Sequence, residues 1–116
     1  MHYQGSCHCG RIRFEVATEV PITEACDCNC SMCRRRGGLL WFAPREAFAL
    51  SVPEEDLSTY SFHKHALKHH FCPACGIATH SEGESPQGPM VAINVRCLPE
   101  VDLPALKIVE FDGASL

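Results

Sequence analysis

Apolar and polar residues alternate over short stretches along this chain. Ile12, Phe14 and Val16 occupy every second position within 11–16, which is the period of a strand with one buried face. Further short apolar stretches are separated by turn residues, as in strands of about five residues; they lie at 39–43, 48–52, 57–62, 68–71, 77–80, 90–95 and 107–111. The pattern predicts a mainly β fold of short strands.

One short helix is expected within this β pattern. Ser31 is a suitable N-cap for a turn through 32–36, and Gly37 and Gly38 would end it. The segment 82–89 contains glycine and proline and is expected to be a loop or a hairpin tip. No internal repeat is visible, and 116 residues suit one domain, so we expect residues 1–116 to form a single domain.

The cysteines change the picture from a plain β domain to a metal protein. Nine are present, and eight fall into groups; the groups are Cys7 with Cys9, then Cys26, Cys28, Cys30 and Cys33, then Cys72 with Cys75, while Cys97 stands alone. A buried structural cysteine gains nothing from close neighbours, whereas a soft metal ion needs several thiolates around one point. The spacing therefore indicates zinc.

The compartment and the partners follow from composition. The beginning of the chain shows no secretory signal pattern and the cysteine count is odd, so free or metal-bound thiols in a reducing cytoplasm are expected rather than disulfides. Ten Lys and Arg against fourteen Asp and Glu give a formal charge of −4, which disfavours a nucleic-acid surface. No apolar run approaches the length of a membrane span, so no membrane partner is expected.

The segment FCPACG, at 71–76, is shaped like a zinc knuckle. Pro73 fixes a turn after the first thiol, and Gly76 permits a positive φ, so that the sulfurs of Cys72 and Cys75 can converge. A knuckle supplies two ligands, but a closed tetrahedral site needs four. The second pair is either Cys7 with Cys9, which share one face if their backbone is extended, or two cysteines of the central group.

The central group has a different character if the first pair joins the knuckle. Cys28, Cys30 and Cys33 then remain as three ligands with one open position, which is the pattern of a catalytic site beside a structural one. A substrate thiolate is a good fourth ligand for zinc, so a small-molecule thiol substrate is worth considering. Alternatively, Cys26 closes the tetrahedron and the second site is purely structural. Cys97 is expected to be a small buried residue.

Three motifs in this order, GSCHCG at 5–10, CNCSMCRRRGG at 28–38 and FCPACG at 71–76, resemble those of the glutathione-dependent formaldehyde-activating enzyme family. The motif is shared by S-(hydroxymethyl)glutathione synthases and by a vertebrate centromere protein. The resemblance implies a β-tent fold of mainly antiparallel strands and a carbon–sulfur lyase that joins glutathione and formaldehyde reversibly. It also implies one structural zinc on Cys7, Cys9, Cys72 and Cys75, and a more labile or catalytic zinc on Cys28, Cys30 and Cys33.

Several charged residues near the cysteines are candidates for substrate binding. We expect Arg34, Arg35, Arg36 or Lys68 to receive the carboxylates of a glutathione-like ligand, because guanidinium groups bind carboxylates in bidentate fashion. His69 or His70, next to the knuckle, is the best candidate for moving a proton, while His63 and His65 are expected at the surface. Two other hypotheses stay open: a zinc-stabilised interaction module without enzymatic activity, and a sensor of thiol oxidation or metal.

Overall fold

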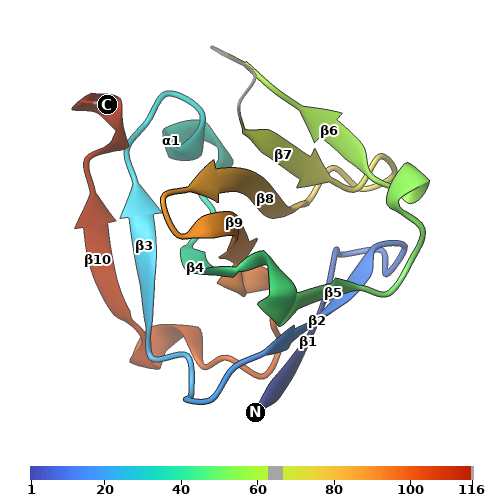
Figure 1. Cartoon of the computed structure of the whole chain (residues 1–116), viewed down its shortest axis with the longest axis horizontal. Helices are drawn as coiled ribbons and strands as arrows, with labels where there is room; N and C mark the ends of the chain where they lie inside the picture. The colour runs from blue at the N-terminus through green and yellow to red at the C-terminus, as the bar shows by residue number, and fades with distance from the viewer. Residues whose placement is uncertain (63–66, 116) are drawn as a thin grey trace.

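The computed structural model describes residues 1–62 and 67–115, and it confirms that the protein is mainly β (Figure 1). His63 and His65 lie outside the described residues. The strands, in chain order, are β1 (His2–Ser6), β2 (Arg13–Ala17), β3 (Glu24–Cys28), β4 (Leu40–Pro44), β5 (Phe48–Leu50), β6 (Ser58–Tyr60), β7 (Lys68–Phe71), β8 (Ala78–Ser85), β9 (Gly88–Asn94) and β10 (Lys107–Phe111). A four-residue helix, α1 (Cys33–Arg36), follows β3. No helix in the described part is both long and apolar enough to cross a membrane.

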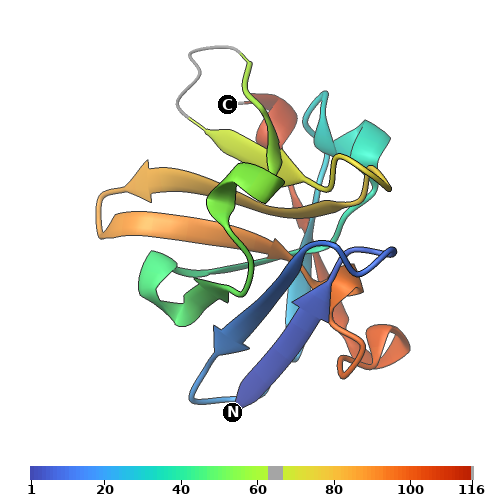
Figure 2. The ribbon, with the colours of Figure 1, turned by 90° about the vertical axis from the view of Figure 1, so that its right-hand side faces the viewer.

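The strands form two sheets. The small sheet has the order β1-β2-β5, and the large one has the order β10-β3-β4-β9-β8-β7-β6. In the described part of the chain, neighbouring strands pair antiparallel except that β10 runs parallel to β3. Figure 2 shows the β1–β2 hairpin at one end of the molecule and the β6–β7 hairpin at the other, with β8 and β9 between them.

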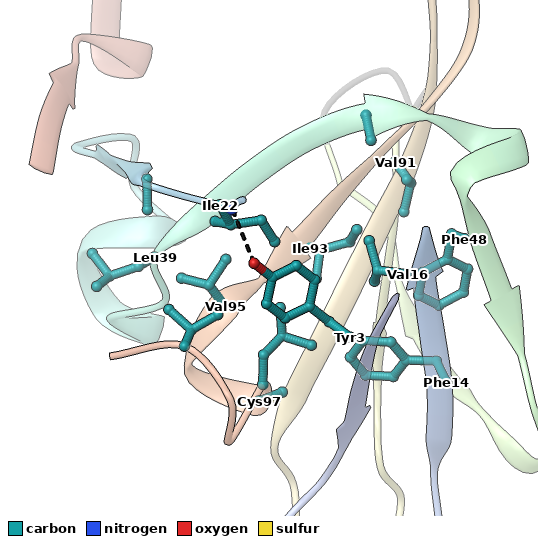
Figure 3. Close-up of a cluster of buried hydrophobic side chains, with 14 of the residues drawn as sticks. Tyr3, Phe14, Val16, Ile22, Leu39, Phe48, Val91, Ile93, Val95 and Cys97 are labelled. Carbon is teal, nitrogen blue, oxygen red and sulfur yellow. Dashed lines mark hydrogen bonds between the residues drawn. The ribbon is translucent and has the colours of Figure 1, made fainter. Parts of the chain in front are cut away.

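The main core lies between the two sheets. Phe14 and Val16 of β2 face Val91 and Ile93 of β9, and all four side chains are at most 1 % exposed. The hydroxyl of Tyr3 also reaches into this core, where it accepts a hydrogen bond of 3.1 Å from the backbone N–H of Ile22 (Figure 3). Burying such side chains contributes about 1.5–3 kcal/mol each, so this apolar layer holds the sheets together.

A second, smaller cluster joins thiols to apolar side chains. Ile12, Cys7 and Cys72 are buried together, and Leu50 and Leu57 pack against them. This cluster lies where the end of β1 meets the turn after β7, so the first and third cysteine motifs are parts of one packed unit. Cys97 is buried in the main core, as the sequence predicts.

The predicted strands are largely confirmed, and the differences concern strands that carry no clear alternation. Strands β7 and β10 have the predicted bounds, whereas β1 and β3 were not predicted. The segment 82–89, expected to be a loop or a hairpin tip, contains the tip of the β8–β9 hairpin, but β8 extends to Ser85. Within residues 1–62 and 67–115, β8 pairs beyond Glu82 with β9 alone, so the strand reaches Ser85 through its pairing within the hairpin.

The helix differs from the prediction at its start. Its N-cap is Met32 and no side chain caps it, so Ser31 does not have the expected role. Gly37 ends the helix in the left-handed conformation, with φ of 73°, as expected for a C-cap glycine. A single turn carries few aligned peptide dipoles, so the helix adds little to the ionisation of nearby thiols.

Candidate functional site

The first cysteine motif forms a tight turn. Cys7 follows β1 directly, and its sulfur accepts a hydrogen bond of 3.3 Å from the backbone N–H of Ile12. Gly10 has φ of 81°, which an L residue with a side chain rarely adopts. Its N–H donates to the Cys7 carbonyl at 3.3 Å. The extended backbone expected for this pair is therefore wrong, because the chain turns at Cys7 instead of continuing the strand.

The third motif forms a matching turn. The backbone N–H groups of Ala74 and Cys75 both lie 3.4 Å from the sulfur of Cys72 and donate to it. Gly76 has φ of 79°, and its N–H donates to the Cys72 carbonyl at 2.9 Å. Backbone donors aimed at a sulfur favour its thiolate form. The N–H groups of Cys9 and Ile77 likewise lower the pKa of Cys75 to about 6.

The two turns bring four thiols to one point. The sulfurs of Cys7 and Cys9 are 3.6 Å apart, and those of Cys9 and Cys72 are 3.7 Å apart. With Cys75, all four sulfurs lie within 4.8 Å of one another. Zinc–sulfur bonds of about 2.3 Å in a tetrahedron place the sulfurs roughly 3.8 Å apart. The geometry thus fits zinc, and the four cysteines could hold it as a closed set of ligands.

The central motif assembles a second group of thiols. Cys28 ends β3, Cys30 lies in the following turn and Cys33 begins α1, and their sulfurs lie within 4.8 Å of one another. The backbone N–H of Cys33 donates to the sulfur of Cys30 at 3.3 Å. Burial opposes ionisation of Cys30, but this N–H and the other hydrogen bonds to its sulfur, from the neighbouring thiols and the backbone of Met32, together outweigh burial and lower the pKa. Burial and the neighbouring thiols raise the pKa of Cys33. A bound cation would allow all three to be thiolates at the same time, because its positive charge offsets the repulsion between them.

Cys26 does not join this group. It lies on β3 beside Leu40 of β4 and Val109 of β10, and its sulfur is not within 4.8 Å of the other three. Burial raises its pKa. Within the part of the chain that the structure describes, the central group therefore has three sulfur ligands, and this arrangement disfavours Cys26 as the fourth.

The C-terminal segment 111–115 lies near the end of β3 (Figure 1), and Gly113 comes close to Cys28 and Cys30. Asn29, between Cys28 and Cys30, donates to Oδ1 of Asp112 at 3.0 Å and accepts from the N–H of Ala114 at 2.9 Å. A Cβ added to Gly113 would lie 2.6 Å from the sulfur of Cys28. We call residues 111–115 the C-terminal strap. Asp112 lies 83 residues after Asn29 in the sequence, so no local sequence pattern could predict this contact.

A groove of about 320 Å³ opens next to the three cysteines. Its lining combines α1, the turn before it and the region of β6; the residues are Ser31, Met32, Arg35, Arg36, Tyr60 and Phe62. The Arg36 guanidinium lies 5.7 Å from the centre of the Phe71 ring, and its charge interacts with Cys33. Arg34 and Lys68 are exposed but do not line the groove. The aromatic residues Tyr60 and Phe62 were not singled out from the sequence.

The two described histidines of β7 have different surroundings. His69 is buried, donates to or accepts from the Ser81 hydroxyl at 2.8 Å through Nδ1, and stacks on Phe62, which lines the groove. Burial and the charge of Arg36 lower its pKa. His70 instead faces Glu82, with Nε2 and Oε2 2.9 Å apart. Of the two, His69 is the one beside the groove.

Comparisons with known proteins agree with this arrangement. The model of a family described as glutathione-dependent formaldehyde-activating enzyme matches residues 2–108. A crystal structure of a Rhodobacter sphaeroides protein is similar with a TM-score of 0.76 and 33 % sequence identity, over 91 % of this chain and 99 % of that chain. The matched residues contain all three cysteine motifs.

Proposed function

Because this chain belongs to the glutathione-dependent formaldehyde-activating enzyme family, we propose that it is a zinc-dependent carbon–sulfur lyase acting on a small thiol adduct, with S-hydroxymethylglutathione as the model substrate. One observation carries the proposal. Among the described residues, three cysteines converge without a fourth Cys, His, Asp or Glu ligand, and the turn that carries them borders a groove lined by two arginines. A purely structural site would be expected to have four protein ligands.

The two thiol groups have different roles in this proposal. Cys7, Cys9, Cys72 and Cys75 hold a structural zinc, whereas Cys28, Cys30 and Cys33 hold a labile or catalytic zinc. When bound at the three-cysteine group, zinc would supply a Lewis acid that keeps the sulfur of the incoming thiol deprotonated at neutral pH. We also propose that the protein is cytoplasmic, because glutathione and free thiols belong to a reducing compartment.

Arg35 and Arg36 are the residues that can orient the thiol substrate. Both line the groove, and Arg35 is held in place because its Nη1 donates to the Ser31 carbonyl at 2.6 Å. Their positive charges match the carboxylates of glutathione, and fixing these carboxylates positions the sulfur toward the cysteines. Arg34 and Lys68 are exposed and do not line the groove, so their proposed role is to attract the anionic substrate from solution.

His69 is the residue best placed to move the proton of the hydroxymethyl group. Its lowered pKa keeps the imidazole neutral near pH 7, so that it can accept this proton when the adduct breaks into thiol and formaldehyde. In the direction of synthesis the same proton returns to the formaldehyde oxygen while sulfur bonds to carbon. Phe62 stacks on His69 and lines the groove, so it connects this imidazole to the groove.

The proposed activity is tested by exchange spectroscopy with ¹³C-formaldehyde and glutathione. The protein should accelerate the exchange between free formaldehyde and S-hydroxymethylglutathione beyond the spontaneous rate, and dialysis against a chelator should remove the acceleration. An unchanged exchange rate with both zinc ions present would contradict the lyase and favour the interaction module. Reversible loss of one zinc under mild oxidation, again without acceleration, would favour the sensor.

Replacing Arg36 with leucine should raise the KM for glutathione about 10–100-fold, because a charge-assisted contact with a carboxylate contributes about 1.5–3 kcal/mol. The kcat should change little, since this contact is made equally in the ground state and the transition state. Steady-state exchange rates over a range of glutathione concentrations measure both values. Arg34→Leu is the matched control, because Arg34 lies on the same helix but does not line the groove. Equal effects of the two variants would contradict the groove as the binding site.

Asn29→Ala should release the C-terminal strap and speed the loss of zinc from the three-cysteine group about thirtyfold, because two hydrogen bonds of about 1 kcal/mol each hold the strap to this side chain. The rate of zinc transfer to a coloured chelator measures this loss, and the slower phase from the four-cysteine group serves as an internal reference. Gln87→Ala, at an exposed turn, is the control. Unchanged kinetics in Asn29→Ala would show that the strap does not restrict access.

A further inference from the structure

A group of polar residues shares no member with the three cysteine motifs, although His70 directly precedes the third motif. His70 of β7 and His80 and Glu82 of β8 each place one possible ligand atom within 4.8 Å of the others. Both histidines are buried, with 7 % and 4 % of their surface exposed. We propose that these three residues form a further metal site, of the two-histidine and one-carboxylate type, that binds a divalent first-row cation such as Zn²⁺.

The hydrogen bonds around the two imidazoles are those that metal-binding histidines need. Nδ1 of His70 lies 2.8 Å from the hydroxyl of Thr59, and Nδ1 of His80 lies 2.9 Å from the hydroxyl of Thr79. A metal-binding histidine generally uses its second ring nitrogen for such a contact, which fixes the orientation of the ring. In both residues Nε2 is therefore the nitrogen that is left for a cation.

The carboxylate is held in the same manner. One oxygen of Glu82, Oε1, forms an ion pair with Nε of Arg45, while Oε2 lies 2.9 Å from Nε2 of His70. Zinc ligands at about 2.0–2.2 Å in a tetrahedron lie roughly 3.3–3.6 Å apart, so this nitrogen and this oxygen, hydrogen-bonded at 2.9 Å, have to separate by only about half an ångström to bind a cation. Arg45 thus fixes one oxygen and leaves the other free to bind the cation.

The alternative to a metal site is that His70, Glu82 and Arg45 form only a network of ion pairs and hydrogen bonds. Such a network does not explain why His80 is buried beside it. The ring of His80 is packed between Phe48, with ring centres 4.2 Å apart, and His70, at 4.7 Å. The Thr79 hydroxyl satisfies Nδ1 of His80, but the ion pair between Glu82 and Arg45 does not need this imidazole, whereas a cation would use its Nε2. Burial lowers the pKa of His80 to about 3, so its nitrogen lone pair is available at neutral pH.

Binding of the cation requires no net release of a proton from the protein. In the empty site His70 accepts a hydrogen bond from Thr59 at Nδ1 and donates from Nε2 to Glu82. The cation takes the position of the Nε2 proton, which moves to Nδ1, and the Thr59 hydroxyl becomes the acceptor. Nitrogen and oxygen ligands distinguish this site from the two thiol groups, and the partly exposed side chain of Glu82 leaves a path from solvent and a position for water.

The test is a titration of protein already saturated at its cysteines with Zn²⁺, followed by isothermal calorimetry and by nitrogen-15 spectra of the histidine side chains. Addition of more Zn²⁺ as chloride should show one further binding event, with shifts of the ring nitrogens of His70 and His80 and none of His2 or His8. His80→Phe, which keeps an aromatic ring beside Phe48, should weaken this event at least tenfold.

Control variants separate this site from binding at the surface. His2→Gln combined with His8→Gln removes two exposed histidines and should leave the binding event unchanged. The proposal is overturned if no further Zn²⁺ binds, if the imidazole signals of His70 and His80 do not move, or if the double variant abolishes binding. The spectra of the natural protein decide the question even if His80→Phe fails to fold.

Discussion

Cys72→Ser is expected to unfold most of the protein at 25 °C. The side chain of Cys72 is fully buried, and its sulfur accepts two backbone N–H groups within the turn that meets Cys7 and Cys9. Structural zinc in small peptides contributes about 10–16 kcal/mol at neutral pH, whereas a small domain has a net stability of about 5–15 kcal/mol. Loss of the four-cysteine centre thus removes a free energy comparable to the total.

Circular dichroism during heating, together with elemental analysis of zinc, measures this outcome. Cys72→Ser should lose at least one zinc and the cooperative thermal transition. Cys97→Ser is the matched control, because Cys97 is also buried but belongs to neither thiol group. It should keep the zinc content and cost only about 1–2 kcal/mol, as is common for a single buried substitution. A Cys72→Ser protein with full zinc content and an unchanged transition would refute a structural zinc on these cysteines.

Cys30→Ser, in contrast to Cys72→Ser, should preserve the fold and abolish the activity. Cys30 is half-buried in a turn outside both hydrophobic clusters, so the sheets do not depend on it. Serine is a poor ligand for zinc, and a Lewis acid at this point is worth several kcal/mol of barrier, so the formaldehyde exchange rate should fall at least about 100-fold. Elemental analysis should find one zinc fewer, while the thermal transition shifts by only a few degrees.

Cys26→Ser is the control for this result, because Cys26 lies two residues before the group but is not part of it. It should retain both zinc ions and the activity. If it loses a zinc, Cys26 is the fourth ligand and the three-cysteine group is closed. If Cys30→Ser unfolds like Cys72→Ser, the division into a structural and a catalytic centre is wrong.

Much of the fold could be predicted because strands with one buried face carry a period of two. The alternation of Ile12, Phe14 and Val16 predicted a strand at 11–16, and β2 lies at Arg13–Ala17, shifted by one or two residues at each end. The bounds of β7 and β10 were predicted as they are observed. Strand β3 escaped prediction because its residues, EACDC, have no such alternation. Its place in the sheet comes from pairing with β10, about 80 positions later along the chain, and a local pattern contains no information on that partner.

The prediction of the site depended on spacing in the same way. Pairs of cysteines two or three positions apart must lie close together, and both turns require their glycines, so candidate ligands could be named from the sequence, although their grouping could not. The groove residues Tyr60 and Phe62 and the C-terminal strap could not be named. They reach the three cysteines through the order of the large sheet, in which β6 and β10 are the two edges.

The sequence by itself determined the chemistry of this protein: thiols at metal-binding spacing, glycines that permit the turns, and alternation that builds short strands. Only the tertiary structure decided which thiols share a centre, that Cys26 stays out of it, and that His70, His80 and Glu82 come together. The physical reason is the separation along the sequence over which each kind of interaction acts. Turns and strand faces are set by neighbours within a few residues, whereas contacts between sheets are set by burial of the whole apolar surface, to which distant segments contribute equally.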